Sequence, residues 1–137
     1  MAFSHTSNTQ TNSRRTTSTT DKTQYLDSVY AVTVVKDLSA TRAWYEKLFG
    51  PAAVDPEPTT AEWKTAEGSW LQVTEDAERA GKSIAIIGTT DLDAQLKLCE
   101  DNGIATGELQ DYGFIRLAIA EDPEGNQLQF VEEVTDS

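Results

Sequence analysis

The chain has 137 residues, 38% of them hydrophobic, and its 23 acidic residues against 11 basic ones give a formal net charge of -12. This charge disfavours nucleic acid and anionic membrane surfaces as partners, because both attract basic side chains. The single cysteine excludes an internal disulfide and a cysteine-cluster metal site, and no stretch is apolar enough for a membrane helix or a secretory signal. We therefore expect one soluble domain in the cytoplasm.

Residues 1–24 differ in composition from the rest of the chain. They contain twelve Ser or Thr and only three hydrophobic residues, too few to offset the entropy lost when a backbone is ordered. We expect a disordered tail over 1–24, which holds the only histidine, His5, and a single folded domain over 25–137. With 22 acidic and 8 basic residues, that domain has a net charge of -14.

The first half of the domain has the pattern of a β-α-β-β-β unit. Residues 28–36 are rich in β-branched side chains and predict a strand, and 39–49 predict a helix that ends at Gly50. The apolar stripe of this helix is predicted at Ala40, Trp44 and Leu48. Three prolines forbid a helix over 51–58, which is a loop or an edge strand. Two further strands are expected over 61–66 and 70–74.

The second half repeats this order. A strand is expected over 82–90 and a helix over 91–102 that ends at Gly103, with an apolar stripe that includes Cys99 as a core thiol. The last three strands are expected over 104–110, 114–120 and 127–132. Asp-Leu pairs recur 54 residues apart, and WLQV at 70–73 is echoed by QLQF at 127–130, 57 residues later. A repeat of this length indicates one supersecondary unit used twice.

Three segments carry a family resemblance: 32–50 (VTVVKDLSATRAWYEKLFG), 70–81 (WLQVTEDAERAG) and 122–133 (DPEGNQLQFVEE). In this order and spacing they resemble the glyoxalase, bleomycin-resistance and extradiol-dioxygenase superfamily, also called the vicinal oxygen chelate (VOC) superfamily. The resemblance implies an α+β fold of two βαβββ modules, about 25–80 and 81–137, that form a cup-shaped half-barrel. It also implies a homodimer and a ligand site inside the cup.

Enzymes of this family commonly hold a divalent metal with one side chain from the first and one from the last strand of each module. Carried over to this sequence, those positions are Tyr30, Gln72, Ile84 and Gln129. Metal cations prefer carboxylate, imidazole or thiolate donors, and an isoleucine cannot coordinate at all. We therefore expect no metal and no other cofactor.

Strand alternation suggests a pocket at the same place. Six residues are predicted to share the side that faces into the cup: Tyr30, Trp70, Gln72, Arg116, Gln127 and Gln129. Leu117 and Ile119 are predicted to face the helices instead. Together with Ile84, the six form the candidate ligand-binding set, since aromatic walls with a few amides suit a small molecule. The alternative is that the aromatic residues are ordinary sheet residues and the glutamines are solvated.

Acidic residues cluster on two loops and are predicted to be solvated charge: Glu75, Asp76, Glu78, Glu121, Asp122 and Glu124.

Two classes of function remain. The first is a metal-free protein that binds a small cationic, aromatic ligand, as bleomycin-resistance members do; the charge of the domain favours a cation. The second is an enzyme, either a divergent metal-dependent lyase, isomerase or dioxygenase of the superfamily, or a metal-free one that uses Tyr30 or a glutamate. Beside these two classes, a partner-binding module that has lost its ligand is a further possibility.

Overall fold

The computed structural model describes residues 22–134, so most of the predicted tail lies outside the described residues. Residues 22–25 form a turn, in which the Leu26 N–H donates to the Thr23 carbonyl at 3.0 Å. Module one then contains β1 (Val29–Val35), α1 (Leu38–Phe49), β2 (Val54–Glu57), β3 (Thr60–Ala66) and β4 (Ser69–Glu75). Module two contains β5 (Ile84–Gly88), α2 (Leu92–Asp101), β6 (Gln110–Asp111), β7 (Ile115–Glu121) and β8 (Gln127–Glu133).

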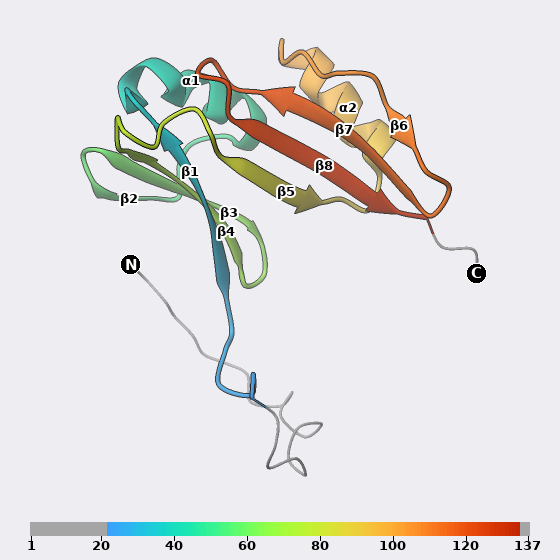
Figure 1. Cartoon of the computed structure of the whole chain (residues 1–137), viewed down its shortest axis with the longest axis horizontal. Coiled ribbons are helices and arrows are strands. Elements are labelled where there is room, and N and C mark those ends of the chain that lie inside the picture. Colours follow the sequence, from blue (N-terminus) through green and yellow to red (C-terminus); the bar gives the residue numbers. More distant parts are fainter. Residues whose placement is uncertain (1–21, 135–137) are drawn as a thin grey trace.

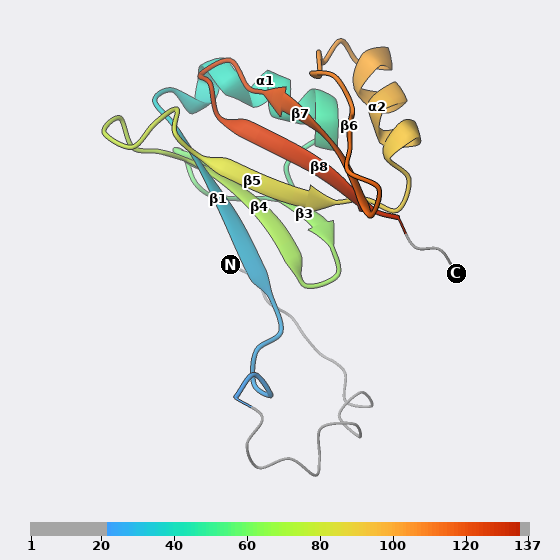
Figure 2. The same ribbon diagram turned by 45° about the vertical axis from the view of Figure 1, so that its right-hand side comes forward.

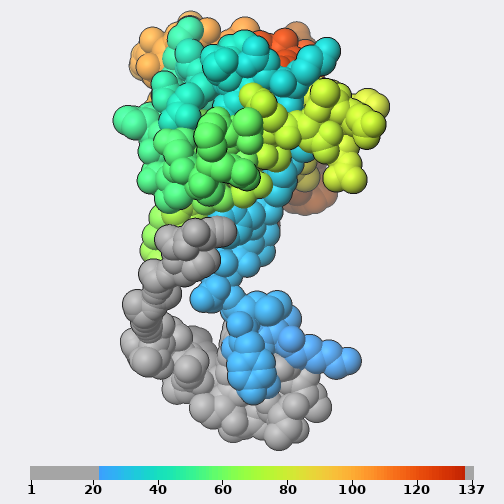
Figure 3. All heavy atoms as spheres, turned by 90° about the vertical axis from the view of Figure 1, so that its left-hand side faces the viewer, coloured from blue at the N-terminus to red at the C-terminus, as the bar shows by residue number. Residues whose placement is uncertain are grey.

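Two four-stranded sheets confirm the predicted α+β fold of two βαβββ modules. The strand order is β1-β4-β3-β2 in one sheet and β5-β8-β7-β6 in the other, with the first and last strands of each module parallel. The edge strands β1 and β5 touch at one end and then diverge (Figures 1 and 2), and the sheets are not closed into a barrel. The start of β1 and the turn before it extend away from the body of the molecule (Figure 3).

The predicted strand over 104–110 is wrong except at its end. Only Gln110 and Asp111 form the short strand β6. Ile104 is 3% exposed and belongs to the core, and the Gly107 N–H makes a single bond to the Ile119 carbonyl at 2.9 Å. Residues 104–109 therefore bury the side chain of Ile104 in the core and do not pair with β7 as a strand.

Both helices lie on one side of the sheets, at the top in Figure 1. One hydrophobic core fills the space between the helices and the sheets. The predicted stripe of α1 is right for Leu48 and wrong for Ala40, which is exposed. The buried residues of α1 are instead Leu38, Thr41, Tyr45 and Leu48. Spacings of three and four residues also define this stripe, and it buries the tyrosine. Cys99 is fully buried on α2, as predicted. Neither helix in residues 22–134 is long and apolar enough to cross a bilayer.

Each helix begins at an equivalent pair of acids. Asp37 and Asp91 are the N-caps of α1 and α2, and both accept a backbone N–H three residues later. Glu75 and Glu132, at the ends of β4 and β8, accept the first helical N–H of α1 and α2 at 2.8 and 3.4 Å. The prediction that Glu75 is solvated charge is therefore wrong, because its carboxylate holds a helix N-terminus.

A buried polar cluster joins the two modules at the β7–β8 turn. Asp122 is 4% exposed and accepts the Tyr45 hydroxyl at 2.6 Å and the Asn126 amide at 2.9 Å. Asn126 is fully buried; its Nδ2 also donates to the Val34 carbonyl at 3.0 Å, and its Oδ1 accepts the Ser83 N–H at 2.9 Å. The prediction of solvated charge is wrong for Asp122 as well, because its carboxylate links α1 of module one to a turn of module two.

Candidate functional site

The face of the sheets that points away from α1 and α2, called the open face below, carries most of the predicted ligand-binding residues. Strand register decides which side chains share it, since residues paired across neighbouring strands point the same way. Tyr30 pairs with Trp70, and Glu62 pairs with Gln72. All four lie opposite to the buried Leu71 and its neighbours, so module one brings Tyr30, Trp70 and Gln72 together as predicted.

Tyr30 and Trp70 form a stacked pair on the open face. Their ring centroids are 5.6 Å apart and their planes differ by 10°. Both side chains are only half-buried, which leaves ring surface available. Desolvation, and then the nearby charges of Glu62 and Asp27, raise the pKa of Tyr30 above its usual value of 10.0, so the phenol is neutral at pH 7.

Glu62 is a residue of the site that the sequence analysis missed. Its side chain is 1% exposed and accepts a hydrogen bond of 2.7 Å from the Gln72 Nε2. Within residues 22–134 it has no ion-pair partner, and the neighbouring Lys64 pairs with Glu67 instead. A buried carboxylate without a cation is unusual, because burying a charge is costly unless it is paired. In the sequence, the position of Glu62 between the apolar Ala61 and Trp63 was the feature that could have indicated its burial.

Module two gives the open face a different character. Ile84 and Ile86 of β5 are 62% and 66% exposed. On β8, the Gln129 Nε2 donates to the Gln127 Oε1 at 3.1 Å. Ile84, Gln127 and Gln129 therefore share one face, as predicted, but the surface is aliphatic with two amides rather than aromatic.

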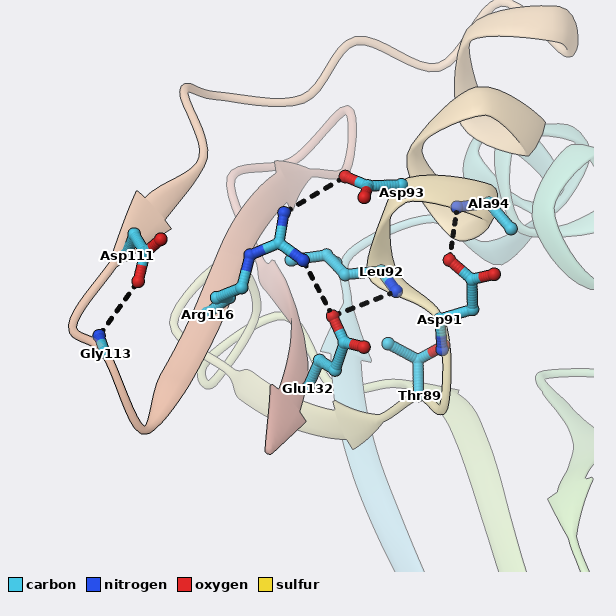
Figure 4. A network of polar contacts seen from close by, with 9 residues as sticks. All are labelled: Thr89, Asp91, Leu92, Asp93, Ala94, Asp111, Gly113, Arg116 and Glu132. Carbon is cyan, nitrogen blue, oxygen red and sulfur yellow. Dashed lines mark hydrogen bonds and ion pairs between the residues drawn. The ribbon is translucent and has the colours of Figure 1, made fainter. Parts of the chain in front are cut away.

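The prediction that Arg116 faces the ligand is wrong. Arg116 pairs with Glu132 in the β7–β8 register and lies on the helix side (Figure 4). Its guanidinium binds Glu132 at 3.0 Å and Asp93 of α2 at 3.1 Å. The hydrogen bond that the guanidinium donates to Asp93 is the main reason that the pKa of Arg116 is raised. The cation therefore pairs with Asp93 and Glu132 and does not lie on the open face.

The same register reverses the prediction for its neighbours. Ala118 and Ala120 are fully buried against the helix side, whereas Leu117 and Ile119 pair with Val131 and Gln129 on the open face. Beyond Arg116, the helix side of β7 thus carries only the small side chains of Ala118 and Ala120, which pack against the core. Alternating hydrophobicity could not distinguish the two faces, since both are apolar.

A small cavity opens where β1 and β4 diverge from β5. Its volume is about 170 Å³, comparable to a cavity that holds one benzene ring. Trp70 and Ile86 contribute to its wall from the two modules. The other lining residues are Val29, Ala31, Thr65, Ala66, Ser69, Leu71, Ile87 and Gly88.

The four positions at which the family holds a metal do not fit one. Ile84 has no donor atom, Tyr30 is a neutral phenol, and the amide nitrogen of Gln72 points at Glu62. No group of three or more His, Cys, Asp or Glu in the described part of the chain could hold a metal ion. We therefore derive no reaction step through a metal.

Comparison with known proteins agrees with this fold. Residues 28–130 match the Glyoxalase/Bleomycin resistance protein/Dioxygenase superfamily. A crystal structure of a glyoxalase/bleomycin resistance protein from Catenulispora acidiphila is 30% identical, with a TM-score of 0.73 over 78% of this chain and 98% of that one. No curated protein matches the chain.

Two more distant structures are similar in fold alone. TnmS3, an antibiotic binding protein from Streptomyces sp. CB03234, is 16% identical, with a TM-score of 0.65 over 78% of this chain and 95% of that one. A bleomycin resistance determinant encoded on the transposon Tn5 is 17% identical, with a TM-score of 0.66 over 80% of this chain and 99% of that one.

Proposed function

Because the chain belongs to the glyoxalase/bleomycin resistance protein/dioxygenase superfamily, we propose that it binds a small aromatic cation on the open face, without a metal ion. The observation that carries the proposal is the stacked Tyr30–Trp70 pair beside the buried Glu62–Gln72 pair. Aromatic faces attract cations and planar rings, and a carboxylate that lacks a cation of its own supplies the opposite charge.

The surroundings of the pair support an aromatic ligand. The half-buried rings of Tyr30 and Trp70 leave a surface on which a planar ring can stack. Ile84 and Ile86 extend an apolar surface from it across module two. The net charge of -12 raises the local concentration of cations around the molecule. Two proteins that share the fold are described as an antibiotic binding protein and a bleomycin resistance determinant.

A homodimer and a cytoplasmic location are part of the same proposal. The exposed Ile84 and Ile86, with Val32 of β1 at 48% exposure, form an apolar surface of the kind that proteins cover by association. Sedimentation equilibrium tests whether the chain forms a homodimer. We expect a dimer that Ile86→Asp converts to a monomer, and a wild-type chain that is monomeric at all concentrations would contradict the assembly.

Metal content is the first measurement to make. Elemental analysis of gently purified protein, followed by melting-temperature titrations with Ni²⁺, Zn²⁺ and Mn²⁺, should give no stoichiometric metal and no concentration-dependent stabilisation. A near-stoichiometric metal whose addition raises the melting temperature would refute the metal-free part of the proposal and favour the enzyme class.

Ligand binding is tested with proflavine, a planar cation, by fluorescence titration. Trp70→Ala should weaken binding about tenfold or more, because stacking on one aromatic ring is worth roughly 1–3 kcal/mol. Tyr112→Ala is the matched control, since Tyr112 is 59% exposed on the turn between β6 and β7, in the other sheet from Tyr30 and Trp70. Equal losses in the two variants, or none in Trp70→Ala, would show that the dye binds elsewhere.

A further inference from the structure

The Gln72 amide has a fixed orientation. Its Nε2 donates to the Glu62 Oε2 at 2.7 Å. The nitrogen must therefore face Glu62, which turns the carbonyl oxygen Oε1 the other way. Within the described residues no donor bonds to that Oε1, and the side chain is only half-buried. Gln72 thus presents an acceptor to the open face.

Gln129, the equivalent residue of module two, is arranged in the same way. Its Nε2 donates to the Gln127 Oε1 at 3.1 Å, so the nitrogen is again occupied by a neighbouring acceptor. Its own Oε1 has no donor among residues 22–134, and its side chain is half-buried. Both halves of the open face therefore carry an amide whose nitrogen is bound internally and whose oxygen remains available.

We infer that the open face selects cations that carry N–H donors, namely ammonium, amidinium or guanidinium groups, through the Oε1 atoms of Gln72 and Gln129. Glu62 is a positioning residue: it holds the Gln72 amide nitrogen and places a negative charge behind the acceptor. This inference rests on the proposed function and narrows it to one ligand class. Hydrogen bonds that involve an ionised partner are the strong ones, so a charged donor benefits most.

The inference separates two kinds of cation that an aromatic pair alone would treat alike. The faces of Tyr30 and Trp70 attract any cation, including a quaternary ammonium group that has no N–H. The Oε1 atoms of Gln72 and Gln129 each favour an ammonium group that donates a hydrogen bond. Anions are disfavoured by Glu62, whose carboxylate has no cation within the described part of the chain.

Three matched probes test this on the full chain by NMR titration: benzylammonium, benzyltrimethylammonium and benzyl alcohol. Each carries one phenyl ring, which can stack on the Tyr30–Trp70 pair. We expect benzylammonium to bind about tenfold more tightly than either of the others, because it alone combines charge with donors. Gln72→Met and Gln129→Met should each reduce that preference, whereas Gln95→Met on α2 is a control of the same chemistry away from the face.

Glu62→Gln distinguishes a positioning role from a structural one. We expect the affinity for benzylammonium to fall about tenfold and that for benzyl alcohol to stay within twofold. An equal loss for all three probes, or a wild-type chain that binds benzyltrimethylammonium at least as tightly as benzylammonium, would overturn the inference and leave aromatic-cation binding intact. If wild type binds none of the probes and does not bind proflavine, the proposed function fails and this inference with it.

Discussion

Tyr45→Phe isolates the contribution of a single buried hydroxyl that links the modules. In wild type this hydroxyl donates to Asp122 at 2.6 Å, and the tyrosine is fully buried between α1 and the core. A hydrogen bond to a charged group contributes about 1.5–3 kcal/mol to the free energy of unfolding. We expect a loss of about 2 kcal/mol, which lowers the melting temperature of a domain of this size by roughly 8 °C.

The same substitution has a pH dependence whose sign follows from the structure. Burial, and then the hydrogen bond to Asp122, raise the pKa of Tyr45 above 10.0. The unfolded chain therefore loses this proton near pH 10 while the folded chain keeps it, so the contribution is complete below pH 10 and decreases above it. The decrease is at most about 1.4 kcal/mol per pH unit. Wild type and Tyr45→Phe should converge in unfolding free energy near pH 11.5.

Urea unfolding monitored by circular dichroism measures both effects. Tyr112→Phe is the control, because its hydroxyl bonds to Gln110 at an exposed position and its loss should change stability by less than about 0.5 kcal/mol. A cost for Tyr45→Phe no larger than that of the control, or a difference from wild type that persists unchanged to pH 11.5, would refute the assigned role of the Tyr45–Asp122 bond.

Two other predictions follow from the backbone and from the ion pairs. Gly81→Ala should cost more than about 2 kcal/mol in urea unfolding, because φ is +81° and the new Cβ would lie 2.8 Å from the Glu124 carbonyl oxygen; Gly103→Ala, with φ of +78° and open space, should cost about 1 kcal/mol. Similar costs for the two would show that the close approach is relieved by a small shift. Arg116→Ala should leave proflavine affinity within twofold of wild type, because the guanidinium faces Asp93 on α2; a larger loss would return this residue to the binding face.

The architecture was predictable because its signals are local and occur twice. The Asp-Leu pairs that open both helices, and the WLQV and QLQF strands, recur at nearly one period, and the structure places each pair at equivalent positions. Local periodicity was less informative where a helix has two apolar stripes. In α1 it favoured the exposed Ala40, whereas the core buries Tyr45, whose hydroxyl has a partner far along the chain. The predicted Trp44 is partly buried and packs against the core.

The site was predictable only in part, because it depends on register and on burial. Tyr30, Trp70 and Gln72 could be placed on one face, since short parallel strands with a clear repeat fix their alternation. Arg116 could not, because both faces of β7 are apolar. Glu62 was missed because a glutamate in a strand usually points to water, and its burial arises from neighbours that are contributed by other strands.

The pairs that start the helices have stayed alike in the two modules, whereas the faces opposite to them have diverged. Tyr30 beside Trp70 in module one corresponds to Ile84 beside Gln127 in module two, at the same place in each ladder. The scaffold is therefore nearly twofold symmetric and its recognition surface is not. A molecule that lies across the boundary between β1 and β5 meets rings and a negative charge at one end and aliphatic side chains at the other. If the molecule were turned end for end, each of its ends would contact side chains of the other kind. A duplicated fold of this kind can therefore favour one orientation of an elongated, amphipathic molecule.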